Sequence, residues 1–271
     1  GLLKPLILWL KKINKYNVEL LVTGIHLLKK YWSTIDFIKK DNIDINYIVS
    51  ISENWDMLSW LSEEISWIND VLKNNKIDLI FVLGDRDEPL AASIWAAHFK
   101  IPVAHIHWWD ITWHLPDEYI RGAITKFAHL HFTASKNSYK RVLSMWENEK
   151  NIFNVWAIWL DWINKSKLYT KKELSHFLWL DNKKKWILLL QHPTISDISY
   201  EKQINNVLLV LKNIDAEKII IYPNSDEWSS IYIENIEKYK DKNSFHLFEN
   251  INRKYYLSLL NIIDIIVWNS S

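Results

Sequence analysis

Apolar residues recur along the chain with two different periods. Stretches with apolar residues at helical spacing, such as 2–13, are followed by short runs rich in isoleucine, valine and leucine, such as 77–83. This alternation is typical of a mostly parallel sheet covered by helices, so we predict an α/β protein. The expected strands are 18–23, 45–50, 77–83, 101–106, 130–133, 152–155, 186–191, 218–222, 244–248 and 262–267.

Two polar stretches divide these strands into two sets. A Lys/Asn/Ser-rich segment at 164–172 and a charged run at 181–185 flank one short helix, as expected for a connection between domains. We therefore predict an N-terminal Rossmann-like domain at 1–163, a connection at 164–185 and a partial C-terminal Rossmann-like domain at 186–271. The chain opens on a helix and stops directly after a strand, so we interpret it as a fragment cut at both ends.

Charge and cysteine content narrow the class of protein. The 271 residues carry a net charge of +1, which gives no global attraction to nucleic acid or to an anionic membrane. No apolar stretch approaches the roughly 18 residues that span a bilayer. The chain has no cysteine, which excludes disulfides, thiolate metal sites and a cysteine nucleophile. We expect a cytoplasmic enzyme with no nucleic-acid partner and no membrane partner.

The glycine content is anomalous. The chain has 4 glycines and 17 tryptophans, whereas average usage predicts roughly 19 glycines. Trp146 and Trp179 close helix-like segments, where a left-handed cap favours glycine. Other tryptophans stand at turn positions, namely Trp108, Trp109, Trp228 and Trp268. We interpret these as positions where the native protein has glycine, as when a UGA codon that is read as glycine is translated as tryptophan. The alternative is a Trp-rich protein whose indoles stack on sugars or fill the core.

Polar residues follow the third and fourth strands, at the edge where parallel α/β sheets bind ligands. After the third strand come Gly84, Asp85 and Arg86, where glycine permits a tight turn. The acidic residues that follow also suit a helix N-terminus. The fourth strand contributes His105, His107 and Asp110.

A helix is expected to carry Asp117 and Arg121, which lie four residues apart and so face the same side. These two residues could form a simple ion pair on the helix surface. Together with the histidines and Asp85, they also suit acid/base chemistry beside an anionic leaving group. The sequence has no HExxH pattern, so we predict no metal site.

With glycine at the tryptophan positions, consecutive segments resemble the hydrolysing UDP-N-acetylglucosamine 2-epimerases. The segment 105–110 then reads His-Ile-His-Gly-Gly-Asp, and 154–161 reads Asn-Val-Gly-Ala-Ile-Gly-Leu-Asp. The segments 117–132, 191–193 and 268–271 also resemble family motifs, and Arg86 favours the hydrolysing branch. The resemblance implies two Rossmann-like domains in a GT-B arrangement, with the active site in the interdomain cleft. It also implies a UDP-sugar substrate, no cofactor and a possible homo-oligomer.

The resemblance assigns roles to individual residues. It makes Asp85, Asp117, His105 and His192 catalytic candidates. The expected substrate-binding residues are Arg86, Arg121, His107, Asp110, Asn269, Ser270 and Ser271. His107 stands where several members have glutamate, and Asp110 or Asp117 could supply that carboxylate.

The predicted reaction converts UDP-N-acetylglucosamine and water to N-acetylmannosamine and UDP through a glycal. Nothing in these motifs reads the C4 or C6 substituents of the sugar, so a modified substrate such as UDP-diacetylbacillosamine is an alternative. A GT-B glycosyltransferase is disfavoured by the acid/base cluster after the fourth strand. A UDP-sugar-binding protein without turnover is the alternative from another class.

Overall fold

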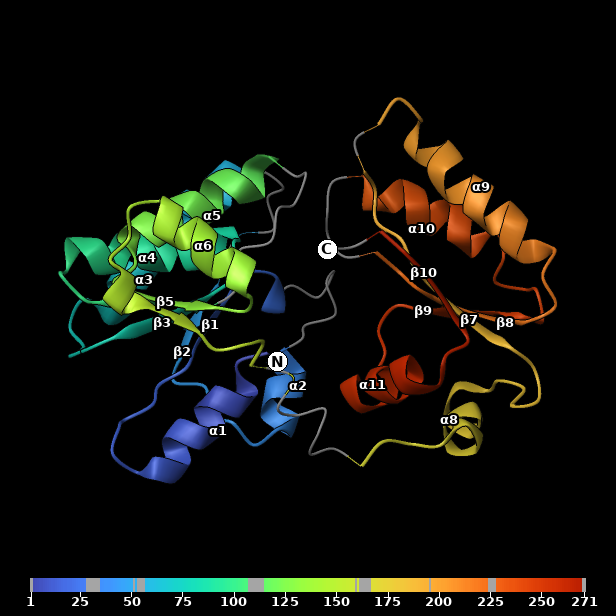
Figure 1. The fold of residues 1–271 in the computed structure, drawn as a ribbon, viewed down its shortest axis with the longest axis horizontal. Coiled ribbons are helices and arrows are strands. Elements are labelled where there is room, and N and C mark those ends of the chain that lie inside the picture. Colours follow the sequence, from blue (N-terminus) through green and yellow to red (C-terminus); the bar gives the residue numbers. More distant parts are fainter. Residues whose placement is uncertain are drawn as a thin grey trace. The chain divides into compact units, whose positions relative to one another are not determined.

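The structure, a computed structural model, describes residues 2–27, 35–50, 52, 57–106, 115–158, 160, 167–194, 196–223 and 228–269. The chain divides into two compact units, Gly1–Asn164 and Lys165–Ser271. Each unit contains parallel strands and helices, which confirms the predicted α/β class (Figure 1).

The first unit contains two parallel sheets. The strands β1 and β2 pair with each other, and a four-stranded sheet has the order β3-β4-β5-β6. The strands are β1 (Leu21–Thr23), β2 (Tyr47–Val49), β3 (Ile80–Leu83), β4 (Val103–Ile106), β5 (Leu130–Thr133) and β6 (Ile152–Asn154). The α-helices are α1 (Lys4–Ile13), α2 (Ile35–Lys40), α3 (Met57–Leu72), α4 (Asp87–His98), α5 (Leu115–Phe127) and α6 (Lys136–Ser144), and the 3-10 helices are η1 (Gly24–His26) and η3 (Glu149–Asn151).

The core of the first unit lies between its strands and the helices α3, α4 and α5. Ile68 of α3, Trp95 of α4 and Ile124 of α5 are buried there against Val82 of β3 and Val103 of β4. Alternate strand residues point to this side, as the period of two requires. This packing fixes the carboxyl ends of β3 and β4 next to the first turns of α4 and α5.

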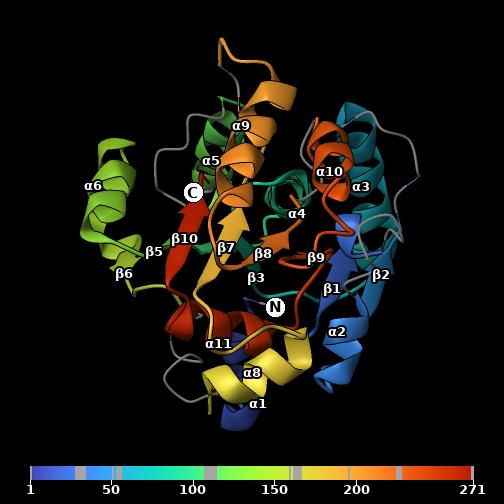
Figure 2. The ribbon, with the colours of Figure 1, turned by 90° about the vertical axis from the view of Figure 1, so that its right-hand side faces the viewer.

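The second unit has one parallel sheet with helices on both faces. Its strand order is β10-β7-β8-β9. Figure 2 shows α9 and α10 on one face and α8 and α11 on the other. The strands are β7 (Trp186–Leu190), β8 (Glu217–Ile221), β9 (Phe245–Phe248) and β10 (Ile265–Trp268), and the helices are α8 (Lys171–Leu178), α9 (Tyr200–Lys212), α10 (Ser229–Glu237) and α11 (Arg253–Ile262).

Successive side chains of β7 alternate between the two hydrophobic cores of this unit. Ile187 and Leu189 pack toward α9 and α10, whereas Trp186 and Leu188 pack toward α8 and α11. Every residue from Trp186 to Leu189 is therefore buried, as expected for a central parallel strand. The segment 164–185, expected as a connection, lies almost entirely in the second unit, because Leu174 and Leu178 of α8 are part of its core.

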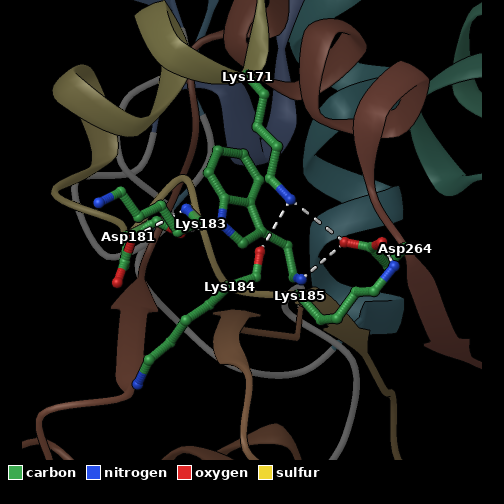
Figure 3. Close-up of polar contacts among 7 residues, drawn as sticks. Lys171, Asp181, Lys183, Lys184, Lys185 and Asp264 are labelled. Atoms are coloured by element: carbon green, nitrogen blue, oxygen red, sulfur yellow. Dashed lines mark hydrogen bonds and ion pairs between the residues drawn. The ribbon is translucent and has the colours of Figure 1, made fainter.

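Charged side chains fasten the beginning of β7. Asp264 accepts hydrogen bonds from the backbone N–H of Trp186 and from Lys185 Nζ, at 2.9 and 2.8 Å. Lys171 Nζ lies 3.4 Å from the same carboxylate and 4.9 Å from the ring centroid of Trp186. Figure 3 shows Lys171 and Lys185 converging on Asp264. These contacts lower the pKa of Asp264 to about 2, with the Lys185 hydrogen bond as the largest cause.

Several tryptophans adopt the backbone conformation that favours glycine. Among the described residues, seven non-glycine residues have positive φ, and four of these are Trp146, Trp156, Trp179 and Trp228, with φ of 68°, 63°, 53° and 70°. Their side chains are exposed, from 48% for Trp228 to 94% for Trp146. The left-handed conformation predicted for Trp146 and Trp179 at helix ends is confirmed. Trp268, in contrast, is the last residue of β10 and does not lie in a turn.

Candidate active site

In the first unit, a tight turn follows β3 and carries Asp85. Gly84 has φ of 87°, and its N–H donates to the carbonyl of Ile106 at 3.1 Å. Its own carbonyl accepts a hydrogen bond from His105 Nε2, at 2.8 Å. His105 is fully buried on β4, so its ring supports the turn from below. Because β3 and β4 are paired in register, this contact fixes where Asp85 leaves the sheet.

Helix α5 brings a buried arginine to this turn. Arg121, 2% exposed, forms an ion pair with the carboxylate of Asp85. Its other terminal nitrogen donates to Glu118 Oε1 at 2.7 Å, one helical turn earlier. A buried charge is costly unless it is paired and hydrogen-bonded, so the two carboxylates stabilise the guanidinium in this position. The arrangement orients Asp85 at the carboxyl edge of the sheet.

The carboxylates around this turn shift one another's pKa values. Burial raises the pKa of Asp85, and the negative charge of Asp117 raises it further, whereas the Arg121 hydrogen bond opposes the shift. Burial and the charges of Glu88 and Asp117 likewise raise the pKa of Asp87. Asp117 thus lies within electrostatic range of both groups. Titratable groups with shifted pKa values at a sheet edge are typical of active sites.

In the second unit, His192 follows the end of β7 and is held by Asn269. The backbone N–H of His192 donates to Asn269 Oδ1, and Asn269 Nδ2 donates to the carbonyl of His192, both at 2.8 Å. Asn269 follows β10, the strand that pairs with β7. The side-chain amide of Asn269 therefore fixes the backbone of His192.

The loop after His192 is held from α9. Gln203 donates to the carbonyl of Thr194 at 2.8 Å and to the carbonyl of Ile198 at 2.9 Å. It also accepts a hydrogen bond from Tyr232 of α10, at 2.7 Å. Gln203 thus connects the segment around His192 to two helices.

The structure brings together most of the predicted residues that it describes. Asp85, His105 and Arg121 meet at the carboxyl ends of β3 and β4, with Asp117 nearby and Arg86 directly before α4. His192 and Asn269 meet at the corresponding edge of the second unit. His107, Asp110, Ser270 and Ser271 lie outside the described residues.

Two residues of these networks were missed by the sequence predictions. Glu118 stands directly beside Asp117, and its spacing of three from Arg121 also allows an ion pair. From the sequence we considered an i, i+4 ion pair of Asp117 with Arg121, because the burial of Arg121 beside Asp85 cannot be seen in the sequence. Gln203 lies in an ordinary amphipathic helix, and no local pattern distinguishes it from a solvated glutamine.

Neither a metal-binding group of side chains nor a membrane-spanning helix is found in the described part of the chain. There, no three histidine, cysteine, aspartate or glutamate side chains are grouped so that they could hold a metal ion. No helix in the described ranges has the length and apolar character needed to cross a membrane.

Known sequences match this chain over nearly its whole length. The sequence profile of the family described as UDP-N-acetylglucosamine 2-epimerase matches residues 9–271. The chain belongs to this family. A UDP-N,N'-diacetylbacillosamine 2-epimerase (hydrolyzing) from Legionella pneumophila is 30% identical, over 100% of this chain and 73% of that protein. A UDP-N-acetylglucosamine 2-epimerase from Neisseria meningitidis serogroup B is 27% identical, over 100% of this chain and 72% of that protein.

Solved structures of related proteins have the same fold as this chain. The crystal structure of the Neisseria meningitidis UDP-GlcNAc 2-epimerase bound to UDP-GlcNAc has a TM-score of 0.82 at 22% identity, and the match covers 99% of this chain and 74% of that one. The Methanocaldococcus jannaschii enzyme in complex with UDP-GlcNAc and UDP has a TM-score of 0.77 at 18% identity, covering 99% and 75%. These structures confirm the fold, and the family match over residues 9–271 confirms the predicted resemblance to the 2-epimerases.

Proposed function

We propose that this family member is a hydrolysing UDP-N-acetylglucosamine 2-epimerase, which converts UDP-N-acetylglucosamine and water to N-acetylmannosamine and UDP. The observation that carries the proposal is the buried pair of Asp85 and Arg121 at the carboxyl edge of the first sheet. It places a carboxylate, held by a fixed arginine, where an α/β sheet binds its ligand.

The reaction requires a base near C2 of the sugar. As the C1–O bond to UDP breaks, positive charge develops at C1, and the neighbouring C2 hydrogen becomes acidic. A carboxylate, Asp117 or Asp85, removes this proton and a glycal forms. Water then adds its oxygen to C1, and C2 receives a proton from the opposite face, which gives N-acetylmannosamine.

The contacts of Arg121 and His105 refine their proposed roles. The guanidinium of Arg121 is engaged by Asp85 and Glu118, so we assign it to the orientation of Asp85. His105 is buried beneath the turn, so its role is also positioning. Charge on the departing diphosphate is then left to Arg86 and His192, together with the backbone around Ser270 and Ser271.

A second substrate has a specific observation in its favour. Two of the more similar relatives, from Legionella pneumophila and Campylobacter jejuni, are both described as hydrolysing 2-epimerases of N,N'-diacetylbacillosamine nucleotides, and both are 30% identical to this chain. The same elimination and hydration would apply, because the C4 and C6 substituents do not take part. UDP-N,N'-diacetylbacillosamine is therefore the alternative substrate.

The test is UDP release by the full-length protein without an acceptor sugar. Each UDP-sugar is supplied separately in deuterium oxide, and the free sugar is analysed by NMR. We expect an inverted C2 that carries deuterium. UDP release without C2 inversion would indicate simple hydrolysis, and binding without release would favour the non-catalytic alternative.

Asp117→Asn separates chemistry from binding. The neutral amide cannot accept the C2 proton, so we expect turnover to fall roughly 10²- to 10⁴-fold while the affinity for UDP changes little. Asp70→Asn is the matched control, because Asp70 pairs with Lys73 on the exposed side of α3. Near-normal turnover of Asp117→Asn would count against the assignment of this residue.

A further inference from the structure

A buried carboxyl group lies behind the candidate site of the first unit. Glu64, on α3, is 1% exposed, and its Oε1 accepts a hydrogen bond from Thr23 Oγ1 at 3.0 Å. Its Oε2 is buried and has no hydrogen-bond partner among the described residues. An ionised carboxylate with one hydrogen bond is far more costly in such a place than a protonated, neutral acid. No predicted site residue explains this group.

Thr23 leads into a turn that is packed on the start of α4. Gly24 has φ of 66°, and a methyl group at this position would overlap the side chain of Glu88. Glu88 therefore lies directly on the turn backbone. His26, at the end of the turn, is within electrostatic range of Glu88 and Arg86. The turn after β1 is thus joined to the same helix start that follows Asp85.

Like charges face Glu64 from α4. Burial, together with the charges of Glu88 and Asp87, raises the pKa of Glu64 to about 8, although the hydrogen bond from Thr23 opposes the shift. From β1, Thr23 donates to Glu64, and η1 carries His26, which lies within electrostatic range of Glu88. Ionisation of Glu64 would place a third carboxylate beside Glu88 and Asp87.

We propose that Glu64 is a positioning residue that acts in its protonated form and holds the turn after β1 against the start of α4, so that Asp85 and Arg86 keep their places. If Glu64 lost its proton, the negative carboxylate would repel Glu88 and loosen the turn. The role rests on the proposed function only in its effect on turnover. The protonation of Glu64 and the order of the turn can be measured without a substrate.

The protonation state is tested first by carbon-13 NMR of glutamate side-chain carboxyls. The Glu64 signal is assigned by its absence in Glu64→Gln. We expect it to titrate near pH 8, with a parallel loss of hydrogen-exchange protection around Thr23 and Asp87. Glu63→Gln is the matched control, because this neighbouring carboxylate accepts hydrogen bonds from Ser52, whereas Thr23 donates to Glu64. A signal that titrates near the ordinary value of 4.5 would overturn the proposal.

Turnover against pH is the second test. In the wild type and in Glu63→Gln, turnover should fall about tenfold per pH unit above pH 8. Glu64→Gln keeps the neutral, hydrogen-bonding form at every pH, so it should retain turnover and lose this alkaline decline. Glu64→Ala should be impaired throughout, mainly in kcat.

In the tests with Glu64→Gln, three results would overturn the proposal. They are an inactive but folded Glu64→Gln protein, a Glu64→Gln protein that does not fold, and an unchanged alkaline decline in that variant. Absence of turnover in the wild type with both UDP-sugars would instead contradict the proposed function. In that case the NMR titration and hydrogen exchange still decide the role of Glu64.

Discussion

The tryptophans are of two kinds: some are exposed and have a left-handed backbone, and others are buried in the core. Trp179 follows α8 with φ of 53°, and the next residue, Leu180, donates its N–H to the carbonyl of Ser175 at 2.9 Å. This hydrogen-bond pattern is the glycine-type helix end. Trp186, in contrast, is fully buried and its indole N–H donates to the carbonyl of Asp181 at 2.8 Å. The glycine interpretation therefore suits Trp179 and does not suit Trp186.

Trp179→Gly should stabilise the protein by about 1 kcal/mol. A left-handed conformation costs a residue with a Cβ about 1–2 kcal/mol, and the larger chain entropy of glycine offsets part of this gain. Trp186→Gly is the contrasting variant and should cost about 3–5 kcal/mol, because it empties a core position. Urea unfolding of the second unit measures both changes. A loss of stability in Trp179→Gly would contradict the glycine interpretation at that helix end.

The amide of Asn269 makes a residue-scale prediction for the second unit. Asn269→Ala removes both hydrogen bonds to the backbone of His192, so the backbone that carries the imidazole is no longer held in place. We expect turnover to fall about 10- to 100-fold, as misplaced catalytic groups do. Asn213→Ala is the control, because the side chain of Asn213 donates to the carbonyl of Leu209, four residues earlier in the chain. Equal turnover of the two variants would show that Asn269 does not position His192.

At the scale of elements, hydrophobic periodicity predicted each strand within three residues at either end. The run 130–133 coincides with β5, whereas 18–23 extends three residues beyond the start of β1. Apolar character continues outside the paired residues, because pairing depends on the neighbouring strand and not on composition alone. The charged run 181–185 looked like a linker, yet the neighbouring helix α8 packs its apolar side into the core of the second unit.

The site was predictable where a polar residue follows a strand directly. Asp85 and His192 both stand at such positions, and parallel sheets bring strand ends to one edge. Arg121 could be placed on a helix face, but its pairing with Asp85 depends on how α5 packs across β3 and β4. No sequence pattern marks Glu64 as a site residue, because a glutamate in an amphipathic helix is usually solvated. Its burial can be seen only in the fold.

For the whole molecule, the two units have separate hydrophobic cores and different titrating groups. In the first unit, the pKa of Glu64 is raised from its ordinary 4.5 to about 8. In the second unit, the groups with raised pKa among the described residues are tyrosines and Lys185, including Tyr232 at about 12. Among the described residues, therefore, only the first unit has a strongly shifted carboxyl group that titrates between neutral pH and pH 10.

Mildly alkaline conditions should therefore weaken the first unit before the second. A raised carboxyl pKa contributes stability that is complete below the unfolded value of 4.5 and is lost as the pH rises through about 8. Between pH ~7 and ~9 the free energy of unfolding of the first unit should fall by about 1.4 kcal/mol. Hydrogen exchange resolved by peptide follows both units in one sample. Glu64→Gln should remove the decline in the first unit and leave the second unchanged, whereas equal declines in both units of the wild type would assign the alkaline loss to other groups.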